Sequence, residues 1–537
     1  MVVYQGKGLF PGVAFGTIHL LKKAEAVEQE IVQDAQKEWE RFLKAKQDTD
    51  EQLEALYEKA KEDIGEDEAM IIDVQRMMLV DFDFNKGVEN MIRNERFSAA
   101  YAVSQTGQQM AEIFASMDDA YMKERATDVR DVSQRLTDTL VGRRSALQFT
   151  NPVIVVADDL TPSETLQMDK TKIRAFVMRK GSANSHTAIL ARMMNIPCII
   201  QADIPPEPTF HGQELIVDGE EGTLYLEPDA DIREKMLEKQ KAEQAEKELL
   251  EAVRGLPSVT KDGRKVKLYA NIGGVEDVEP ALSHDAEGVG LFRSEFLYLG
   301  RGDFPSEEEL FTAYRKVAEG MGSRLVVIRT LDIGADKQVD YFQLDEEENP
   351  ALGLRGIRIC IDRPDLFRTQ LRAIYRASAF GHVAMMFPMI VSAWEVRHCK
   401  AAAAAVRHEL AGEGVSIGEV ALGIMIETPA AVMLADDLAK EVDFFSVGTN
   451  DLTQYTLAID RQNDKLERFY DAKHPAVLAM LKMIAQAAKD NGIWSGVCGE
   501  LAADPELLTE LVNMGFDELS VSPAYILRMR KHIREMG

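Results

Sequence analysis

The second half of the chain repeats one pattern of hydrophobic and polar positions. After Pro257, short apolar runs alternate with longer segments in which apolar residues recur at helical spacing. The eight runs are residues 266–270, 288–292, 325–329, 383–388, 422–426, 443–447, 494–498 and 518–521. Eight strand–helix units in succession predict a (β/α)8 TIM barrel over residues 257–537.

The first half combines two other patterns. Residues 1–20 contain short apolar runs punctuated by glycine and proline, which predicts a pair of strands. Residues 21–144 contain no proline, and their apolar residues recur at helical spacing, which predicts a bundle of roughly four helices. Short strand-like runs return at residues 145–228. The sequence therefore predicts an α/β multidomain protein, in which a small α/β domain (residues 1–20 and 145–228) contains an inserted helical bundle and precedes the barrel.

Two helical segments raise the questions of partner binding and of domain movement. Residues 71–79 are rich in methionine, a pattern that belongs to a hydrophobic core or, less often, to a partner-binding surface. Residues 229–256 contain Lys, Glu, Gln and Ala with few apolar positions, as is typical of a solvated connecting helix. We predict that this helical linker is a hinge that lets residues 1–228 swivel against the barrel.

Composition and charge narrow the function classes. The 537 residues carry a formal net charge of −28. This charge disfavours binding to nucleic acid, whose phosphates would be repelled. It would suit a small basic partner, although acidic surfaces more often serve only solubility. There is no apolar run of the roughly 18 residues that a membrane span requires. The cysteines Cys198, Cys360, Cys399 and Cys498 lack metal-ligand spacing, and we expect a cytoplasmic protein with reduced thiols.

One histidine lies in an unusual segment. His186 follows small and hydroxyl-bearing residues at 181–185 and precedes an apolar helical run at 187–192. Asn184 or Ser185 would cap this helix, so that the imidazole lies near the positive end of the helix dipole, where an anion is stabilised. The segment by itself fits a phosphate-carrying histidine and an ordinary histidine at a helix start equally well.

Polar and charged residues follow the predicted barrel strands, at the end where barrel enzymes hold their active sites. They include Asn271, Arg293, Glu295, Arg329, Asp332, Glu427, Asn450, Asp451, Cys498 and Glu500, with Arg355, Arg358 and Arg461 in the loops. Several guanidinium groups at one barrel mouth predict a substrate with more than one negative charge, because they match phosphate and carboxylate oxygens. Lys337 would add a point charge near a phosphate.

Three of these residues suggest chemistry beyond anion binding. Glu427 and Asp451 follow the fifth and sixth strands, and they would either hold Mg²⁺ or pair with the arginines. We favour the metal, since phosphate chemistry usually needs a cation. Cys498 ends the seventh strand, where its thiol would donate a proton to a carbanion-like carbon or would simply be a buried structural cysteine.

Three segments resemble signatures of the phosphoenolpyruvate-utilising enzymes: residues 181–192, 287–296 and 443–454. The resemblance extends nearly end to end and is closest to the members that phosphorylate a carrier protein in the bacterial sugar phosphotransferase system. Further matching segments are residues 125–132, 157–163, 329–334 and 497–500. Ser182, Asn184 and Ala335 depart from the family pattern, and we expect these small residues to tune the chemistry and not to abolish it.

This resemblance implies a reaction and assigns residues to it. Phosphate would pass from phosphoenolpyruvate to Nε2 of His186, and then to a histidine of the small carrier protein HPr, docked on the helical domain at residues 21–144. Cys498 would protonate the enolpyruvate to pyruvate, and Thr165 would orient the His186 ring. Mg²⁺ would be held by Glu427 and Asp451, and substrate by Arg293, Arg329, Arg355, Asn450 and Arg461. The barrel would form a homodimer.

Two other functions fit parts of the sequence. A synthase-like or dikinase-like member of the same family would need a nucleotide-binding domain, for which there is no room, and the chain lacks the Walker-type motif Gly-x-x-x-x-Gly-Lys-Ser/Thr. A regulatory phosphorelay protein with an inactive barrel would signal through its phosphorylation state. Such a protein would have no need of the complete set of arginines, carboxylates and cysteine at the strand ends.

Overall fold

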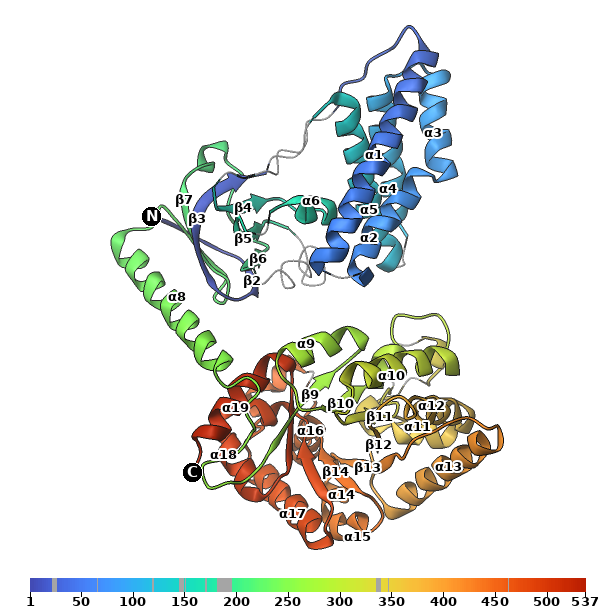
Figure 1. The fold of residues 1–537 in the computed structure, drawn as a ribbon, viewed down its shortest axis with the longest axis vertical. Helices are drawn as coiled ribbons and strands as arrows, with labels where there is room; N and C mark the ends of the chain where they lie inside the picture. Colours follow the sequence, from blue (N-terminus) through green and yellow to red (C-terminus); the bar gives the residue numbers. More distant parts are fainter. Residues whose placement is uncertain are drawn as a thin grey trace. The chain divides into compact units, whose positions relative to one another are not determined.

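A computed structural model of the chain describes residues 1–21, 27–64, 66–117, 120–143, 149, 151–169, 171–180, 196–334, 340–345, 347–461 and 463–537. The chain divides into two compact units, Met1–Glu246 and Lys247–Gly537 (Figure 1). The first unit contains a mixed sheet and a helical bundle, and the second contains a closed barrel.

The sheet of the first unit has eight strands in the order β1-β8-β7-β3-β4-β5-β6-β2. They are β1 (Val2–Gln5), β2 (Lys7–Phe10), β3 (Val13–Leu20), β4 (Val153–Ala157), β5 (Ile173–Met178), β6 (Cys198–Ile200), β7 (Glu214–Asp218) and β8 (Thr223–Leu226). Its two faces are covered by separate clusters of buried apolar side chains, one around Ile154 and Val177 and the other around Val155 and Phe176.

The predicted strand pair at residues 1–20 is wrong. These residues form three strands that do not pair with one another: β1 pairs with β8, β2 with β6, and β3 with both β4 and β7. The glycines permit close backbone contact with distant segments. A Cβ atom at Gly8 would lie 2.2 Å from the carbonyl oxygen of Gly219, and one at Gly222 would lie 2.2 Å from that of Gly6. Glycine spacing that resembles a local turn thus reflects long-range packing.

The helical bundle lies between β3 and β4 in the sequence, as predicted. In the described residues it has five helices where about four were expected: α1 (Ala35–Ile64), α2 (Glu66–Leu79), α3 (Phe82–Arg93), α4 (Ala99–Ala115) and α5 (Ala120–Val141). The start of α3 is a boundary that the proline-free sequence does not reveal. There the Asp81 carboxylate caps the helix by accepting a hydrogen bond from the Phe84 N–H at 2.8 Å.

The methionine-rich segment is partly buried and partly exposed. Met78 packs partly buried against the bundle core, next to the fully buried Leu79. Met77 is 60% exposed, and Val80 and Phe82 beyond it are more than 70% exposed. Residues 71–79 therefore contribute to the core on one side and to an apolar surface on the other.

A short helix, α6 (Pro162–Gln167), follows β4 and precedes β5. Its own residues form a capping box: the Glu164 N–H donates to Oγ1 of Thr161, and the Thr161 N–H donates to the Glu164 carboxylate. Although α6 connects two strands of the sheet, its Leu166 is buried in the core of the bundle.

The linker helix α8 (Ala230–Glu251) is more firmly attached than a solvated connector. Met236 is buried against Val13 and Ile216 of the sheet. The Lys239 ammonium pairs with the buried Asp218 carboxylate at 2.8 Å. The first half of α8 thus packs on the sheet through Met236 and the partly buried Ile232.

The second unit confirms the predicted barrel. Eight parallel strands close on themselves: β9 (Lys267–Ile272), β10 (Val289–Arg293), β11 (Val326–Arg329), β12 (Val383–Phe387), β13 (Ala421–Ile426), β14 (Phe444–Val447), β15 (Trp494–Val497) and β16 (Glu518–Val521). Each strand lies within two residues of a predicted run. The α/β multidomain class, with an inserted helical bundle and a C-terminal TIM barrel, is therefore confirmed.

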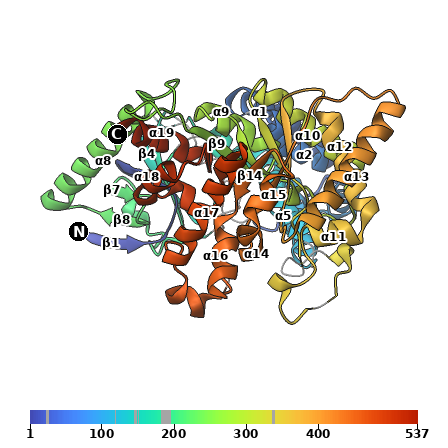
Figure 2. The same cartoon turned by 90° about the horizontal axis from the view of Figure 1, so that it is seen from below.

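Helices surround the barrel strands (Figure 2). They are α9 (Val278–Ser283), α10 (Glu307–Met321), α11 (Ile357–Asp362), α12 (Pro364–Ala377), α13 (Ala393–Gly412), α14 (Pro429–Met433), α15 (Ala435–Ala439), α16 (Thr449–Leu457), α17 (Pro475–Asn491), α18 (Pro505–Met514) and α19 (Ile526–Glu535). Their apolar faces and the outward side chains of the strands form one continuous core.

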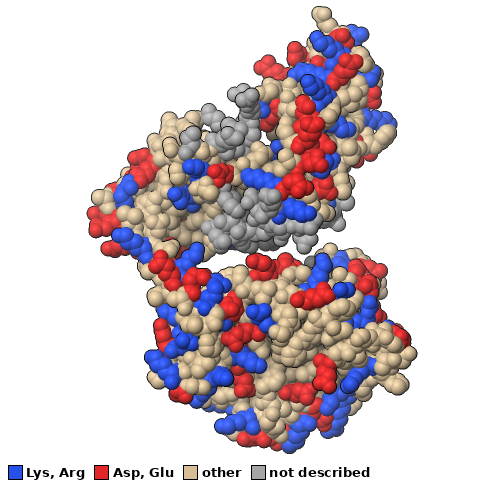
Figure 3. Space-filling model, viewed as in Figure 1, with Lys and Arg blue, Asp and Glu red and all other residues tan. Residues whose placement is uncertain are grey.

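The surface is highly charged. Acidic and basic side chains are interspersed over the face shown in Figure 3, although the chain as a whole is strongly acidic. Of the helices that the structure describes, none combines the length and the apolar character that crossing a membrane would need.

Candidate active site

In the closed barrel, the residues that the sequence places after the strands lie together at one end. Arg293 at the end of β10 pairs in register with Arg329 at the end of β11. The last residues of β13 and β14, Ile426 and Val447, are also paired, and Val447 pairs in turn with Val497 of β15. The residues that follow these strands, Glu427, Gly448 and Cys498, therefore begin at the same height at the carboxyl end of the barrel.

Two of the arginines are buried and held by carboxylates. Arg329 is 6% exposed, and its guanidinium binds Glu295 at 2.6 Å and Asp332 at 2.9 Å. The other oxygen of Asp332 lies 3.4 Å from Nη2 of Arg355, so that one carboxylate bridges two guanidinium groups. Burial alone would lower the pKa of Arg329, but the charges of Glu295 and Asp332 outweigh it and raise the pKa. Arg329 thus stays charged, and the carboxylates fix the direction of both guanidinium groups.

Glu427 and Asp451 are buried carboxylates with unsatisfied oxygens. Glu427 is fully buried, and its Oε1 accepts a hydrogen bond from the Met389 N–H at 2.6 Å. Within the described part of the chain, neither Oε2 of Glu427 nor Oδ1 of Asp451 has a hydrogen-bond partner. Nη2 of Arg461 lies 3.9 Å from Oδ1 of Asp451. Burial, and then repulsion from Asp332 and Asp451, raises the pKa of Glu427 to about 8.

These features fit a divalent cation. Two buried carboxylates that repel each other and present unpartnered oxygens are stabilised when a positive charge lies between them. Mg²⁺ is typically held by one or two protein carboxylates, with substrate oxygens and water as its other ligands. The described residues contain no group of three or more His, Cys, Asp and Glu side chains that would hold a metal.

Cys498 lies directly after β15 and is 3% exposed. Its thiol donates to the carbonyl oxygen of Val447 at 3.4 Å. Burial raises the pKa of the Cys498 thiol to about 12. At neutral pH the group is therefore a protonated thiol, which suits a proton donor better than a nucleophile.

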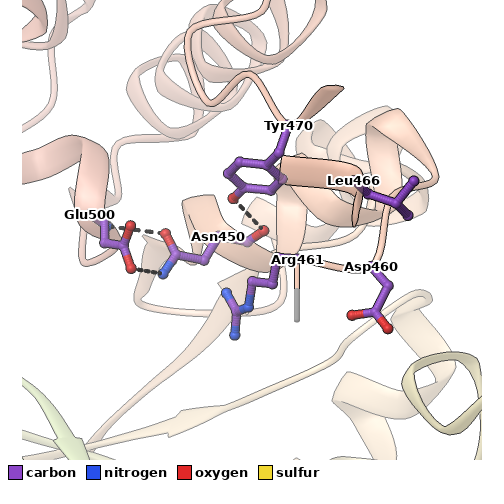
Figure 4. Close-up of a pocket in the computed structure, with 6 residues that line it drawn as sticks. All are labelled: Asn450, Asp460, Arg461, Leu466, Tyr470 and Glu500. Carbon is purple, nitrogen blue, oxygen red and sulfur yellow. Dashed lines mark hydrogen bonds between the residues drawn. The ribbon is translucent and has the colours of Figure 1, made fainter. Parts of the chain in front are cut away.

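A cavity of about 190 Å³ is lined by Asn450, Asp460, Arg461, Leu466, Tyr470 and Glu500. Asn450 and Glu500 lie side by side in its lining and point toward each other (Figure 4). The Asn450 amide donates to the Glu500 carboxylate at 3.1 Å, and the Glu500 N–H donates to Oδ1 of Asn450 at 3.2 Å. The cavity thus contains two of the predicted substrate-binding residues, Asn450 and Arg461.

The structure describes only some of the remaining predicted site residues. His186 and Lys337 lie outside the described residues, as do Ser182, Asn184 and Ala335, so that their roles stay predictions. Thr165 is fully buried in α6, where its hydroxyl donates to the carbonyl oxygen of Thr161 at 3.0 Å.

Several residues at the site had no role in the sequence prediction. Glu295 and Asp332 were noted at strand ends, but nothing in the sequence indicated that they hold arginines. Tyr470 was missed altogether, and its hydroxyl donates to the backbone carbonyl of Asn450 at 3.4 Å. It lies in a loop about twenty residues beyond Asn450, where no spacing or motif indicates proximity to the site.

Family models match almost the whole chain. Residues 247–537 match the PEP-binding domain of the PEP-utilising enzymes. Residues 5–125 match the N-terminal domain of these enzymes, and residues 149–222 match their mobile domain.

Individual relatives agree with the family models. The phosphoenolpyruvate-protein phosphotransferase of Staphylococcus carnosus is 40% identical over 534 residues, covering 98% of this chain and 92% of the relative. The protein of the same name from Bacillus subtilis is 39% identical over 542 residues, covering 99% of this chain and 94% of the relative. A solution structure of Enzyme I is 33% identical and covers 45% of this chain and 99% of that one, with a TM-score of 0.39.

Proposed function

Because the chain belongs to the PEP-utilising enzymes, as a phosphoenolpyruvate–protein phosphotransferase of the Enzyme I type, we propose that it carries phosphate on His186 and passes it to HPr. The observation that carries this proposal is the pair Glu427 and Asp451, with unpartnered oxygens beside arginines that are already fixed. These features argue against a barrel without catalytic function.

Substrate binding would use the charged groups at the barrel mouth. Phosphoenolpyruvate has a phosphate and a carboxylate, and planar guanidinium groups bind both in a bidentate manner. The residues proposed to hold them are Arg293, Arg329, Arg355, Arg461 and Asn450, with Lys337 as a further charge. Since Glu295 and Asp332 already fix Arg329 and Arg355, these groups need little rearrangement when substrate arrives.

We assign Mg²⁺ to Glu427 and Asp451. When bound there, the ion would offset negative charge on the phosphoryl oxygens and so make phosphorus easier to attack. In the transfer, the bond between phosphorus and the enol oxygen breaks and a bond from phosphorus to Nε2 of His186 forms. Thr165 would hold the ring in the required direction.

The enolate that remains would be protonated by Cys498. Its thiol gives a proton to the terminal carbon, which becomes the methyl group of pyruvate, and the thiolate then recovers a proton from water. The protonated state that burial imposes on this thiol supports the role.

The proposed reaction is tested by incubating the protein with phosphoenolpyruvate labelled in the phosphate, together with Mg²⁺. Wild type should acquire an acid-labile, base-stable label, as expected for phosphohistidine, and His186→Ala should acquire none. Equal labelling of the two proteins would refute the proposal.

The carrier HPr would dock on the helical bundle. A groove of about 280 Å³ there is lined mostly by apolar side chains of α2, α3, α4 and α5, among them Met77, Met78, Met110 and Phe114, and also by Arg125. Val80 and Phe82, which are exposed as Met77 is, follow Met77 closely in the sequence. An apolar patch of this kind marks a surface that binds a partner.

A charge placed in this groove should weaken carrier binding without affecting the barrel chemistry. We expect Met77→Asp to raise the half-saturating HPr concentration about 10-fold, as is typical for loss of an apolar anchor. Its labelling by phosphoenolpyruvate should match that of wild type. Surface plasmon resonance with immobilised HPr measures the first quantity, and unchanged affinity would contradict this docking site.

The remaining organisation is also proposed. The proposed domains are the α/β domain (residues 1–20 and 145–228), the helical domain (21–144), the linker (229–256) and the barrel (257–537). The linker would act as a hinge, and the division of the chain near residue 246 supports this arrangement. Homodimerisation through the barrel is supported by its exposed apolar side chains, including Trp394 and Met433. We place the enzyme in the cytosol on the strength of the family resemblance.

A further inference from the structure

Helix α6 lies between the sheet and the bundle of the first unit. Leu160 and Met168, which flank it, are buried in one core of the sheet. Leu166, within it, is buried in the core of the bundle, and α6 contacts α1 and α2. In Figure 1, α6 extends from the sheet toward the bundle. A change in the position of α6 would therefore shift the sheet relative to the bundle.

The beginning of α6 is held by a buried carboxylate of the bundle. Asp131 of α5 accepts hydrogen bonds from the Ser163 hydroxyl at 2.7 Å and from the Ser163 N–H at 3.3 Å. Gln75 of α2 donates to the same carboxylate at 2.8 Å, and Arg135 of α5 donates to the Ser163 hydroxyl at 2.9 Å. Asp131 is 5% exposed and Ser163 is 1% exposed. A buried carboxylate with this many donors is fixed in place.

The end of α6 is held by a cation of the bundle. The ammonium group of Lys59, on α1, donates to the carbonyl oxygen of Leu166 at 2.8 Å. A negative charge at the start of a helix and a positive charge at its end both match the helix dipole. The capping box of α6 is formed by its own residues, whereas Asp131 and Lys59 belong to the bundle and tie the helix to it. They determine where the helix lies.

Helix α5 links the contact between Asp131 and Ser163 to the groove proposed for the carrier. Arg125, Val129 and Val132 of α5 line the groove, whereas Asp131 of α5 binds Ser163. Two residues after Ser163 is Thr165, which we propose to orient the His186 ring. Helix α5 therefore connects the proposed docking surface to the proposed phosphohistidine site through a rigid element.

We propose that Asp131 and Lys59 form a clamp on α6 that positions the sheet domain, and with it His186, for phosphate transfer to the carrier. This inference rests on the proposed function. Transfer between two histidines requires their in-line approach, and displacement by about 1 Å can slow such a step on the order of 10²-fold. The carrier docks on the bundle, so this transfer depends on how the bundle and the sheet are joined. Transfer from phosphoenolpyruvate uses the barrel and does not require the bundle.

The test separates the two transfers in the full-length protein. Labelling by phosphoenolpyruvate with Mg²⁺ is followed first; the purified phosphoprotein is then mixed with increasing HPr in single-turnover experiments. For Asp131→Ala, Ser163→Ala and Lys59→Met, we expect the limiting rate of transfer to HPr to fall about 10-fold or more. The half-saturating HPr concentration and the labelling rate should remain within about twofold of wild type, because neither the groove nor the barrel is altered.

Two control variants sharpen the result. Ser163→Thr keeps the hydroxyl that donates to Asp131, and it should restore most of the transfer rate. Lys44→Met removes an exposed lysine on the same helix as Lys59, and it should behave as wild type.

The clamp is refuted if all three variants transfer phosphate to HPr at the wild-type rate. It is also refuted if labelling and transfer fall together in proportion to the folded fraction measured by circular dichroism, since that is the signature of a purely structural contact. If Asp131→Ala does not fold, the milder Ser163→Ala and Lys59→Met decide the question. Absence of labelling in wild type would instead refute the proposed function.

Discussion

Replacing Glu427 with glutamine is expected to lower the rate of labelling by phosphoenolpyruvate on the order of 10³-fold. Glutamine keeps the size of the side chain and the oxygen that accepts from the Met389 N–H, but it lacks the charge that would hold Mg²⁺. A cation at a transferring phosphoryl group contributes several kcal/mol of transition-state stabilisation, which corresponds to about three orders of magnitude in rate. Rapid-quench measurement of the labelled protein gives the rate directly.

Thermal unfolding provides an independent measurement of the same site. Mg²⁺ should raise the melting temperature of wild type, because a ligand that binds only the folded state stabilises it. It should leave that of Glu427→Gln nearly unchanged. Glu419→Gln, which neutralises an exposed carboxylate on the barrel, is the matched control and should respond to Mg²⁺ as wild type does. If Glu427→Gln retained both the Mg²⁺-induced shift and near-normal labelling, the assignment of the metal to this residue would be wrong.

Cys498→Ala should separate proton transfer from phosphate transfer. In D2O, the enzyme with Mg²⁺ should exchange the methyl protons of pyruvate for deuterium, and loss of the thiol should slow this exchange at least about 100-fold, a typical contribution of a general acid–base group. Labelling of His186 should fall much less, since the bond to phosphorus breaks before the carbon is protonated. Proton NMR of pyruvate measures the exchange, and Cys399→Ala, which removes another buried thiol, is the control.

The pH dependence of pyruvate formation follows from the burial of the Cys498 thiol. The donor is the protonated thiol, which is present below its pKa, and burial raises the pKa of Cys498 to about 12. The ratio of pyruvate formation by wild type to that by Cys498→Ala should therefore stay constant from about pH 7.5 to 9.5. An ordinary cysteine, with a pKa of about 8.5, would lose most of its protonated form over that interval. A ratio that falls with a midpoint near pH 8.5 would contradict a buried proton donor in this position.

The barrel could be predicted in detail because its physical signal is local. A parallel strand covered on both faces is apolar along its whole length, and each of the eight runs was visible without knowledge of its neighbours. Closure of the barrel then places the residues after the strands at one end, so that Arg293, Arg329, Glu427 and Cys498 could be assigned to one site from their positions in the sequence alone.

The role of His186, in contrast, could not be assigned from the local sequence pattern alone. Its segment suggested phosphate through small neighbours and a helix start, and only the resemblance to a family turned that suggestion into a reaction. The residue lies outside the described part of the structure, as Lys337 does. Their roles remain predictions to be tested by the labelling experiment.

By itself, the sequence determined the order of the domains, the eight barrel strands and the residues at their ends, because these depend on short-range patterns of apolar and polar positions. The tertiary structure alone decided which groups pair: that Asp332 bridges Arg329 and Arg355, that the strands of residues 1–20 pair with segments from 153 onward, and that Asp131 holds Ser163. Except for Arg329 and Asp332, which are three residues apart, these contacts join residues that are far apart in the chain. Their energies depend on distance and burial in the folded state, which periodicity along a sequence does not encode.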